Sequence, residues 1–543
     1  MTDPLLATSD SLVPTGVQLM HAGRAQEAEA LFTSVLEREP QHQDALRNMA
    51  QLTSLQGRVD EAVMYYRRLL AITPDKLEIH NLLGHLLLME GRLVGALEHF
   101  RRALALGDDS LELHRNMGDA LLEMGEPAEA LVSYEKALKL KPESAPTLTL
   151  MGAAYRALNR YDDAIVHFRQ ALAIKSDFTL ANLYLAGTLM LLGDFADGLA
   201  LSEKRFDFEM GFWPQIKKFA GKPTWDGQDL QGKTILVWAE QGMGDNVMMM
   251  RYLPLLKHKG AGTIIVSCHA VLMKIMLTMT KLVVDSELDI PLDSFDFHCS
   301  IQSLPYLFGT TLESIPADVP YLRLPALAGK KWEKPLSRFA GLKVGIAWAG
   351  NKHTARDQLR SIALSCFAPL IALRGVRYFS LQKDAAALQL QETNWPILNW
   401  MDASNDLLDT AALINQLDLV ISADTVIIHL AGALGKPVWL LNRFETDSRW
   451  LIEREDSPWY PTMRIFRQPA MHDWTSVMET VSSELGKLIS AKGVHEMSEQ
   501  QFLAAADAVN KSLGINQNRI RPRTSYDAVI DCIKWLIPKR RMR

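Results

Sequence analysis

Two aspartates stand shortly after apolar runs that have the length of buried β-strands. Asp245 comes after the run 234–238, and Asp424 follows the run 417–422. In open α/β sheets, ligands bind outside the carboxyl ends of the strands, so both carboxylates are expected at a ligand site. Asp245 could alternatively be the N-cap of the helix that it opens, because aspartate is preferred at that position.

A glycine-containing loop separates the first run from Asp245. Gly242 and Gly244 have no Cβ and would let backbone N–H groups approach a ligand closely. The loop does not fit a dinucleotide fingerprint, because Val247 stands where the third glycine belongs. It is not a P-loop either, since no G-K-[ST] sequence follows it. We therefore expect no NAD or FAD cofactor.

The residues after the second run are expected to open a helix. Asp424, Thr425 and His429 lie in its first turns. Free backbone N–H groups and the helix dipole favour an anion such as a diphosphate at this end. His429 could donate a hydrogen bond to a phosphate; alternatively, it is a half-buried histidine with a partner of its own.

Strands that alternate with helices must position these side chains. Short apolar runs predict strands at 234–238, 263–267, 343–348, 376–381, 417–422 and 438–441. Alternation with helices implies parallel sheets. Because the pattern restarts near residue 342, we expect two Rossmann-like domains, at 230–335 and 340–485, that face each other across a cleft.

The N-terminal third repeats itself with a period of 34 residues. Glycines recur at Gly23, Gly57, Gly91, Gly125 and Gly193, with Asn159 in the remaining place, and aromatic residues recur at Phe32, Tyr66, Phe100, Tyr134 and Phe168. An alanine stands four residues before each aromatic residue. Glycine or asparagine permits a turn between two helices, alanine permits close helix contact, and the aromatic ring fills the gap. The pattern resembles the tetratricopeptide repeat and predicts an α-solenoid of about six repeats over 9–212.

Solenoids of this kind bind protein segments on a concave face, which is lined by the first helix of each repeat. That face is expected to present Arg47, Asn81, His85, Arg115, Asp119 and Arg156. We expect several of these side chains to contact a protein partner; alternatively, they are merely solvated polar positions.

Three segments of the second half carry a further resemblance. They are 235–256 with Glu240-Gln241-Gly242-Met243-Gly244-Asp245, 344–361 with Trp348-Ala349-Gly350-Asn351, and 408–440 with Asp424-Thr425 and His429-Leu430-Ala431-Gly432. Together they resemble the heptosyltransferases of glycosyltransferase family nine over about 230–485. The resemblance implies a GT-B fold, which consists of two Rossmann-like domains. Fused to repeats, the chain is similar to bacterial repeat-linked glycosyltransferases, including those that modify flagellin, and in layout to O-GlcNAc transferases.

The family resemblance also implies roles for single residues in an inverting sugar transfer. Asp245 takes the position of the proposed general base, and Arg360 takes that of a basic residue that contacts the donor phosphates. Arg356 or Lys352 could do the same work. Asp424 takes a position that contacts donor hydroxyl or amide groups, and Gln382 could contact the nucleotide base. The expected donor-binding residues are Gly242, Gly244, Asn351, Arg360, Gln382, Asp424, Thr425 and His429.

Composition excludes several other classes of function. The chain contains no D-x-D sequence, so we expect a metal-independent mechanism in which a helix terminus and Arg360 replace the metal charge. The net charge of −5 leaves no excess of cations for nucleic acid. The four cysteines show no C-x-x-C spacing, which disfavours a zinc site or a disulfide framework and fits a reducing compartment such as the cytoplasm.

Membrane contact is expected only at the C-terminus. No run of about 18 apolar residues is free of charges, so no transmembrane segment is predicted. The tail 491–543 is predicted to form helices at 498–513 and 526–537, and it ends in many basic residues. These could make a peripheral contact with anionic lipid; the alternative is a solvated tail.

These observations predict a cytoplasmic bacterial glycosyltransferase that moves a hexosyl, heptosyl or related group from a nucleotide sugar. The repeats would recruit a protein acceptor, such as flagellin or another surface protein. Two alternatives stay open: a transferase that acts on lipopolysaccharide or another glycan, and an inactive scaffold that binds protein partners through its repeats.

Overall fold

The computed structural model describes residues 8–207, 217–240, 242–350, 357–493 and 497–515. The chain divides into two compact units, Met1–Ala181 and Asn182–Arg543. The second unit therefore begins inside the segment 9–212 that the repeat pattern predicts as a solenoid. Helix α11 (Thr179–Leu191) begins in the first unit and continues into the second.

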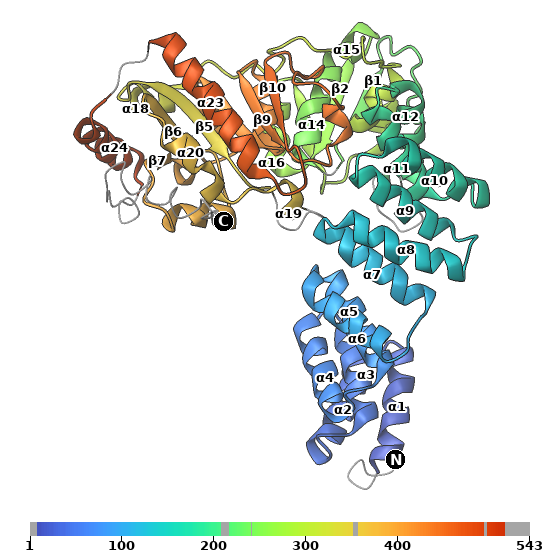
Figure 1. Cartoon of the computed structure of the whole chain (residues 1–543). Helices are drawn as coiled ribbons and strands as arrows, with labels where there is room; N and C mark the ends of the chain where they lie inside the picture. The colour runs from blue at the N-terminus through green and yellow to red at the C-terminus, as the bar shows by residue number, and fades with distance from the viewer. Residues whose placement is uncertain (1–7, 208–216, 241, 351–356, 494–496, 516–543) are drawn as a thin grey trace. The chain divides into compact units, whose positions relative to one another are not determined.

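The first unit consists of helices joined in pairs by turns of two or three residues (Figure 1). Its helices before α11 are α1 (Ser9–His21), α2 (Ala25–Arg38), α3 (Gln43–Leu55), α4 (Val59–Ile72), α5 (Leu77–Met89), α6 (Leu93–Ala105), α7 (Leu111–Met124), α8 (Pro127–Leu140), α9 (Ala145–Ala157) and α10 (Tyr161–Ile174). The predicted turn residues take the left-handed conformation, with φ of 75° at Gly23 and 59° at Asn159, for example. The turn prediction is thereby confirmed.

A second ladder of small residues lies on the first helix of several repeats. A Cβ on Gly84 of α5 would lie 2.6 Å from the Phe100 ring, and one on Gly152 of α9 would lie 2.5 Å from the Phe168 ring. The rings themselves are fully buried. Both helices of such a repeat thus carry a small residue, because the aromatic side chain lies between them.

Two fully parallel sheets form the second unit. Their strand orders are β3-β2-β1-β4 and β10-β9-β8-β5-β6-β7. The strands are β1 (Thr234–Trp238), β2 (Thr263–Cys268), β3 (Leu282–Asp285), β4 (Phe297–Ser300), β5 (Leu342–Ala347), β6 (Val376–Ser380), β7 (Ile397–Asn399), β8 (Leu419–Ala423), β9 (Val438–Asn442) and β10 (Met463–Arg467). The six predicted strands are confirmed, and β3, β4, β7 and β10 are additional.

Both sheets have the strand order of doubly wound α/β folds. Counted from its own first strand, the second sheet reads 3-2-1-4-5-6 and the first reads 3-2-1-4. In such sheets, ligands bind where the strand order reverses, outside the carboxyl ends of the strands. These switch points lie between β1 and β4 in the first sheet and between β5 and β8 in the second.

Helices of different lengths accompany the sheets. They are α12 (Phe195–Ser202), α14 (Met243–Met249), α15 (Leu253–His258), α16 (Ala270–Met276), α17 (Leu304–Leu307), α18 (Lys330–Leu336), α19 (Asp357–Arg360), α20 (Ala368–Ile371), α21 (Leu407–Ile414), α22 (Val426–Ala433), α23 (Trp474–Lys492) and α24 (Glu499–Leu513), with short 3₁₀ turns that include η1 (Glu203–Asp207), η2 (Met250–Tyr252) and η8 (Ser448–Trp450).

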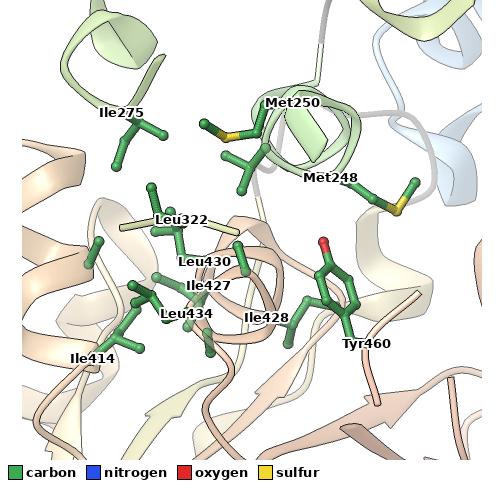
Figure 2. Packing of buried hydrophobic residues seen from close by; sticks show 14 of the residues in the cluster. Met248, Met250, Ile275, Leu322, Ile414, Ile427, Ile428, Leu430, Leu434 and Tyr460 are labelled. Atoms are coloured by element: carbon green, nitrogen blue, oxygen red, sulfur yellow. The ribbon is translucent and has the colours of Figure 1, made fainter. Parts of the chain in front are cut away.

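One hydrophobic cluster joins the two sheets into a shared core. It contains Val237 from the first sheet and Val420 from the second. Within it, α14 packs on α22, and Met248 of α14 and Ile427 and Ile428 of α22 are among its members (Figure 2). The two halves of this unit are therefore packed against each other by apolar side chains.

The segment after α11 belongs to this core as well. The Phe195 side chain of α12 is part of the shared cluster, and its ring centroid lies 6.2 Å from that of Trp459. In η1, Arg205 pairs with Glu240 at 2.7 Å and donates to Ser303 at 2.8 Å. Because the Glu240 side chain is only 2% exposed, this cation offsets the cost of a buried carboxylate beyond β1.

The described C-terminal helix confirms one part of the tail prediction. Helix α24 follows the N-cap Ser498 and forms a capping box with Gln501. Its Phe502 ring packs 5.9 Å from that of Phe339. The predicted helix 526–537 and the basic end of the chain lie outside the described residues. Within the described part of the chain, no helix has the length and apolar character needed to cross a membrane.

Candidate functional site

Asp245 lies in the first turn of α14, beyond the carboxyl end of β1. The helix begins at Met243 after the N-cap Gly242, so the alternative of Asp245 as the N-cap is wrong. Gly242 has a φ of 94°, and a Cβ on it would lie 2.5 Å from Asp245 Oδ2. Both the backbone conformation and the nearby carboxylate therefore require glycine at this position.

Arg449 joins this carboxylate to the second sheet. It lies in η8, in the loop after β9, and its Nη1 donates to Asp245 Oδ1. Its Nη2 donates to Asp424 Oδ2 at 3.3 Å, and its Nε donates to Asp447 Oδ1 at 2.8 Å. One guanidinium thus contacts three carboxylates that come from three segments of the chain.

Asp424 and Thr425 occupy the switch point of the second sheet. Thr425 is the N-cap of α22, and its hydroxyl oxygen accepts from the Ile427 N–H at 3.3 Å. Asp424 Oδ2 accepts from Trp450 Nε1 at 2.8 Å in addition to Arg449. Arg449 therefore brings together Asp245 and Asp424, the two aspartates that the sequence predicts. The Thr425 side chain, in contrast, caps the helix.

His429 is enclosed between the two helices. Its side chain is 1% exposed, and its Nδ1 lies 3.0 Å from the Tyr460 hydroxyl. A Cβ on Gly244 would lie 2.6 Å from His429 Cδ2, so Gly244 provides space for the imidazole ring. These contacts favour the alternative interpretation of His429 as a buried, partnered histidine. They also give Gly244 a packing role between α14 and α22.

The charges of the site shift the ionisation of its members. Partial burial raises the pKa of the Asp245 carboxyl, Asp447 and Asp424 add to the rise, and Arg449 opposes it. Burial disfavours the charged form of Arg449, but the three aspartates raise its pKa well above the usual range. Burial, with Arg449 and Arg251, lowers the pKa of His429 well below its usual range, so this side chain is neutral near pH 7.

Arg360 is a second cation near the switch point of the second sheet. It lies near the end of β5, whereas Asp424 follows β8. Arg360 Nε donates to Asp357 at 2.9 Å. A Cβ on Gly350, just beyond β5, would lie 2.6 Å from Arg360 Nη2. The guanidinium therefore lies over the backbone where a phosphate is expected. Asn351, Lys352 and Arg356, which the sequence also assigns to the donor, lie outside the described residues.

Gln382 connects the ends of β5 and β6. Its Oε1 accepts from the Trp348 and Ala349 N–H groups at 3.0 and 2.9 Å. Its Nε2 donates to the Ala349 and Lys383 carbonyls at 3.0 and 3.3 Å. Both amide atoms are therefore occupied by backbone, and the side chain fixes the loop rather than presenting free groups to a nucleotide base.

Arg251 fixes the end of α14 against the second sheet. Its Nη1 donates to the Trp459 carbonyl at 2.6 Å, and its Nη2 donates to the Tyr321 hydroxyl at 3.1 Å. Its guanidinium also lies 4.7 Å from the centre of the Tyr460 ring. A cation that is buried among carbonyls and aromatic faces gives this junction a defined geometry.

The polar residues predicted for the concave face of the repeats differ in availability. Arg47 and His85 are exposed, whereas Arg115 and Arg156 are partly buried. Arg47 pairs with Asp44 at 3.3 Å. Asn81 donates to Asp108, and Asp119 accepts from Tyr134 at 2.7 Å. Asn81 and Asp119 therefore make bonds within the first unit, and burial raises the pKa of Asp119.

Sequence reasoning missed Arg449, Trp450 and Tyr460. The three residues follow β9. Arg449 binds Asp245 from the half of the first sheet, whereas Trp450 and Tyr460 contact Asp424 and His429 of the second. Arg449 shares one sequence signal with Asp245, since it follows a buried strand at the carboxyl edge of a parallel sheet. Within the described residues, no group of three or more His, Cys, Asp or Glu is arranged to hold a metal ion.

Comparisons with known proteins identify the repeats. Models of the tetratricopeptide repeat match residues 19–86, 75–143 and 109–177. The N-terminal region therefore consists of tetratricopeptide repeats, as the sequence predicts. A curated relative, Protein FlbA of Caulobacter vibrioides, is 27% identical over 335 residues, which cover 57% of this chain and 55% of FlbA. The chain thus spans about half the length of this relative.

Solved structures that resemble the chain do so over about a third of its length. The crystal structure of MamA is 22% identical and covers 30% of this chain and 94% of its own, with a TM-score of 0.29. A tetratricopeptide repeat protein from Parabacteroides merdae is 18% identical and covers 37% of this chain and 79% of its own, with a TM-score of 0.35.

Proposed function

We propose that this chain is an inverting, metal-independent glycosyltransferase of the GT-B fold that acts in the cytoplasm on a protein acceptor bound by the repeats. The observation that carries the proposal is the meeting of Asp245, Arg449 and Asp424 in the second unit. Asp245 follows the first strand of one doubly wound sheet, and Asp424 follows the fourth strand of the other. Both positions are switch points, at which such sheets bind ligands.

The geometry supplies the groups that the reaction needs. In the proposed step, Asp245 takes the proton of the acceptor hydroxyl, and the hydroxyl oxygen forms a bond to C1 of the sugar. The bond from C1 to the diphosphate oxygen breaks, and its electron pair stays with the diphosphate. A carboxylate whose pKa is raised is a stronger base, and the Asp245 side chain, 35% exposed, is accessible to an acceptor.

The donor is assigned to the second sheet. Asp424 can accept hydrogen bonds from sugar hydroxyls, because carboxylate oxygens have several acceptor sites. Arg360, 25% exposed beside the end of β5, can pair with the donor phosphates as charge develops on them. The sugar is a hexosyl, heptosyl or related group attached to a nucleotide.

The repeats support the choice of a protein as acceptor. Tetratricopeptide solenoids expose extended surfaces that hold protein segments. On this chain, the exposed Arg47 and His85 and the partly buried Arg115 and Arg156 are the side chains of the predicted face that can contact such a segment. A surface protein such as flagellin, bound before export, fits this arrangement.

The test compares intact masses of candidate surface proteins produced with the wild-type chain or with Asp245→Asn. Wild type should add the mass of a sugar, and Asp245→Asn should reduce the rate by about 10²–10⁴-fold, the usual contribution of a positioned base. Asp289→Asn is the matched control, because this side chain is fully exposed and follows β3, the edge strand of the first sheet, rather than a switch point. Normal transfer by Asp245→Asn would remove Asp245 as the base.

Two further outcomes would replace the proposal. Sugar found on a glycan, with none on protein, would assign the chain to lipopolysaccharide or glycan synthesis. Neither transfer nor hydrolysis of any nucleotide sugar would leave an inactive scaffold that binds proteins through its repeats.

A further inference from the structure

Arg449 has an unusual set of partners for one side chain. It contacts Asp245 from α14, Asp424 from the end of β8 and Asp447 from its own loop. Each of its three nitrogens is directed at a different carboxylate. A guanidinium is rigid and planar, so these three contacts define the orientation of the Asp245 carboxylate relative to the second sheet.

The same cluster carries an excess of negative charge. Three carboxylates surround one guanidinium, and the adjacent His429 is neutral and buried. Carboxylates that share a site cannot all stay ionised without a compensating cation. Asp245 is the member that burial already disfavours as an anion. Without Arg449, Asp245 would lose the cation that opposes this effect and would take up a proton more readily.

We propose that Arg449 is a positioning residue that orients the Asp245 carboxylate and keeps it ionised for proton abstraction, and that Asp447 opposes this effect as a third negative charge. This inference rests on the proposed glycosyl transfer. Arg449 does not contact the reacting atoms; it acts through Asp245. Asp447 also accepts from the Arg449 N–H at 3.1 Å as the N-cap of η8, and asparagine can cap this turn equally well.

Removal of the Arg449 charge and removal of the Asp447 charge should shift the pH dependence of transfer in opposite directions. Arg449→Gln should move the acid limb of the pH–rate profile upward by about 1–3 pH units, since a neighbouring cation lowers a carboxyl pKa by that amount. Asp447→Asn should move the same limb downward, because a neighbouring carboxylate is removed. Arg449→Lys keeps a positive charge and should stay near the wild-type limb, with a lower rate because one ammonium cannot orient three carboxylates.

A matched control separates the site from the loop that carries it. Arg454→Gln removes a cation from the same loop, where it pairs with Asp456 at 2.6 Å. It should leave the profile unchanged. Thermal unfolding of each full-length variant shows whether it is folded. If Arg449→Gln is unfolded, the other two variants test the proposal. It then requires a downward shift of the acid limb in Asp447→Asn and a limb near that of wild type in Arg449→Lys.

A second measurement needs no catalysis. Titration of ¹³C-carboxyl-labelled aspartate by NMR, with the Asp245→Asn variant for assignment, follows the ionisation of Asp245 directly. Its midpoint should rise in Arg449→Gln and fall in Asp447→Asn. Shifts in the same direction, or none, would overturn the inference even if the wild type transfers sugar. Opposite shifts in a chain that transfers no sugar would instead refute the proposed function and leave the electrostatic role intact.

Discussion

Gly244 of α14 lies so close to the His429 ring of α22 that a Cβ at residue 244 would stand 2.6 Å from His429 Cδ2 and 3.1 Å from Nε2. The ring is held from the other side by the Tyr460 hydroxyl, 3.0 Å from Nδ1, and it lies 5.6 Å from the Trp450 ring. The imidazole is therefore restricted in its movement, and the distance between the two helices depends on this glycine.

Gly244→Ala should destabilise the second unit by about 1–3 kcal/mol, the usual cost of overfilling a packed contact. Gly486→Ala in α23 is the control, because a Cβ there meets no atom within 4 Å. It should be neutral or stabilise by about 0.5–1 kcal/mol through the better helix propensity of alanine. Urea unfolding followed by tryptophan fluorescence reports on this unit, since every tryptophan of the chain follows residue 181. Equal midpoints for Gly244→Ala and wild type would show that the His429 ring can move away freely.

The start of the second unit can be tested by truncation. Removal of residues 1–178 leaves α11 and α12 in place and should leave the second unit folded. Removal of residues 1–212 also takes away Phe195 of the shared core and Arg205, the partner of the buried Glu240. Loss of one partner of a buried ion pair alone costs about 3–5 kcal/mol.

The longer truncation should therefore unfold at a much lower urea concentration than the shorter one, as measured by tryptophan fluorescence. The shorter truncation should also keep donor hydrolysis while modification of the protein acceptor falls, because the recruiting repeats are gone. Identical midpoints for the two truncations would contradict the assignment of α12 and η1 to the second unit.

The raised pKa of Asp245 predicts a specific dependence of stability on pH. A carboxyl whose folded-state pKa lies above its unfolded value of about 4 contributes stability that is fully present below that value and is lost as the pH rises through the folded pKa. Wild type should therefore lose stability relative to Asp245→Asn between about pH 4 and neutral pH. Urea unfolding of both proteins across this range measures the difference. A difference that stays constant with pH would show that Asp245 is not perturbed.

Transfer should continue at an unchanged rate in excess EDTA. The chain has no D-x-D sequence, and Arg360 lies near the carboxyl end of β5, beside the predicted donor site. A guanidinium can stabilise the charge that develops on a leaving diphosphate. The measurement is the transfer rate of the purified chain with and without chelator. Loss of activity that Mg²⁺ or Mn²⁺ restores would refute the metal-independent mechanism.

Local sequence patterns predicted most of the fold correctly. The 34-residue period predicted the turns correctly. A turn in the left-handed conformation requires glycine or asparagine at one position, so the residue type alone marks it. Long apolar runs gave the strands on which the site depends. Strand β4 was missed because Phe297-His298-Cys299-Ser300 is short and mixed in polarity, and β7 has only three residues. Such strands are determined by their neighbours in the sheet, which a local pattern does not contain.

The site was predicted less completely than the fold, for a related reason. Position after a strand identified Asp245 and Asp424, but Arg449 lies 204 residues after Asp245 in the chain, and only tertiary packing brings them together. His429 and Gln382 have residue types suited to ligand contact, yet the structure surrounds them with partners of their own. The sixth repeat keeps the pattern, since Gly193 takes the left-handed conformation and a Cβ on Gly198 of α12 would lie 2.5 Å from Met190 Cγ of α11. Its Phe195 nevertheless belongs to the shared core of the second unit, which the period does not predict.

The core that both sheets share has a consequence for synthesis of the chain. Its N-terminal contributors are complete once Leu322 has emerged from the ribosome, but its last contributor, Val509, follows 187 residues later. At about 5–20 residues per second, this interval lasts roughly 10–40 s. Helix α22 begins 104 residues after Leu322, so the apolar face of α14 stays uncovered for the first half of this interval. Each repeat of the first unit, in contrast, finds its neighbour within one 34-residue period. The second half of this protein should therefore depend on ribosome-associated chaperones far more than the first.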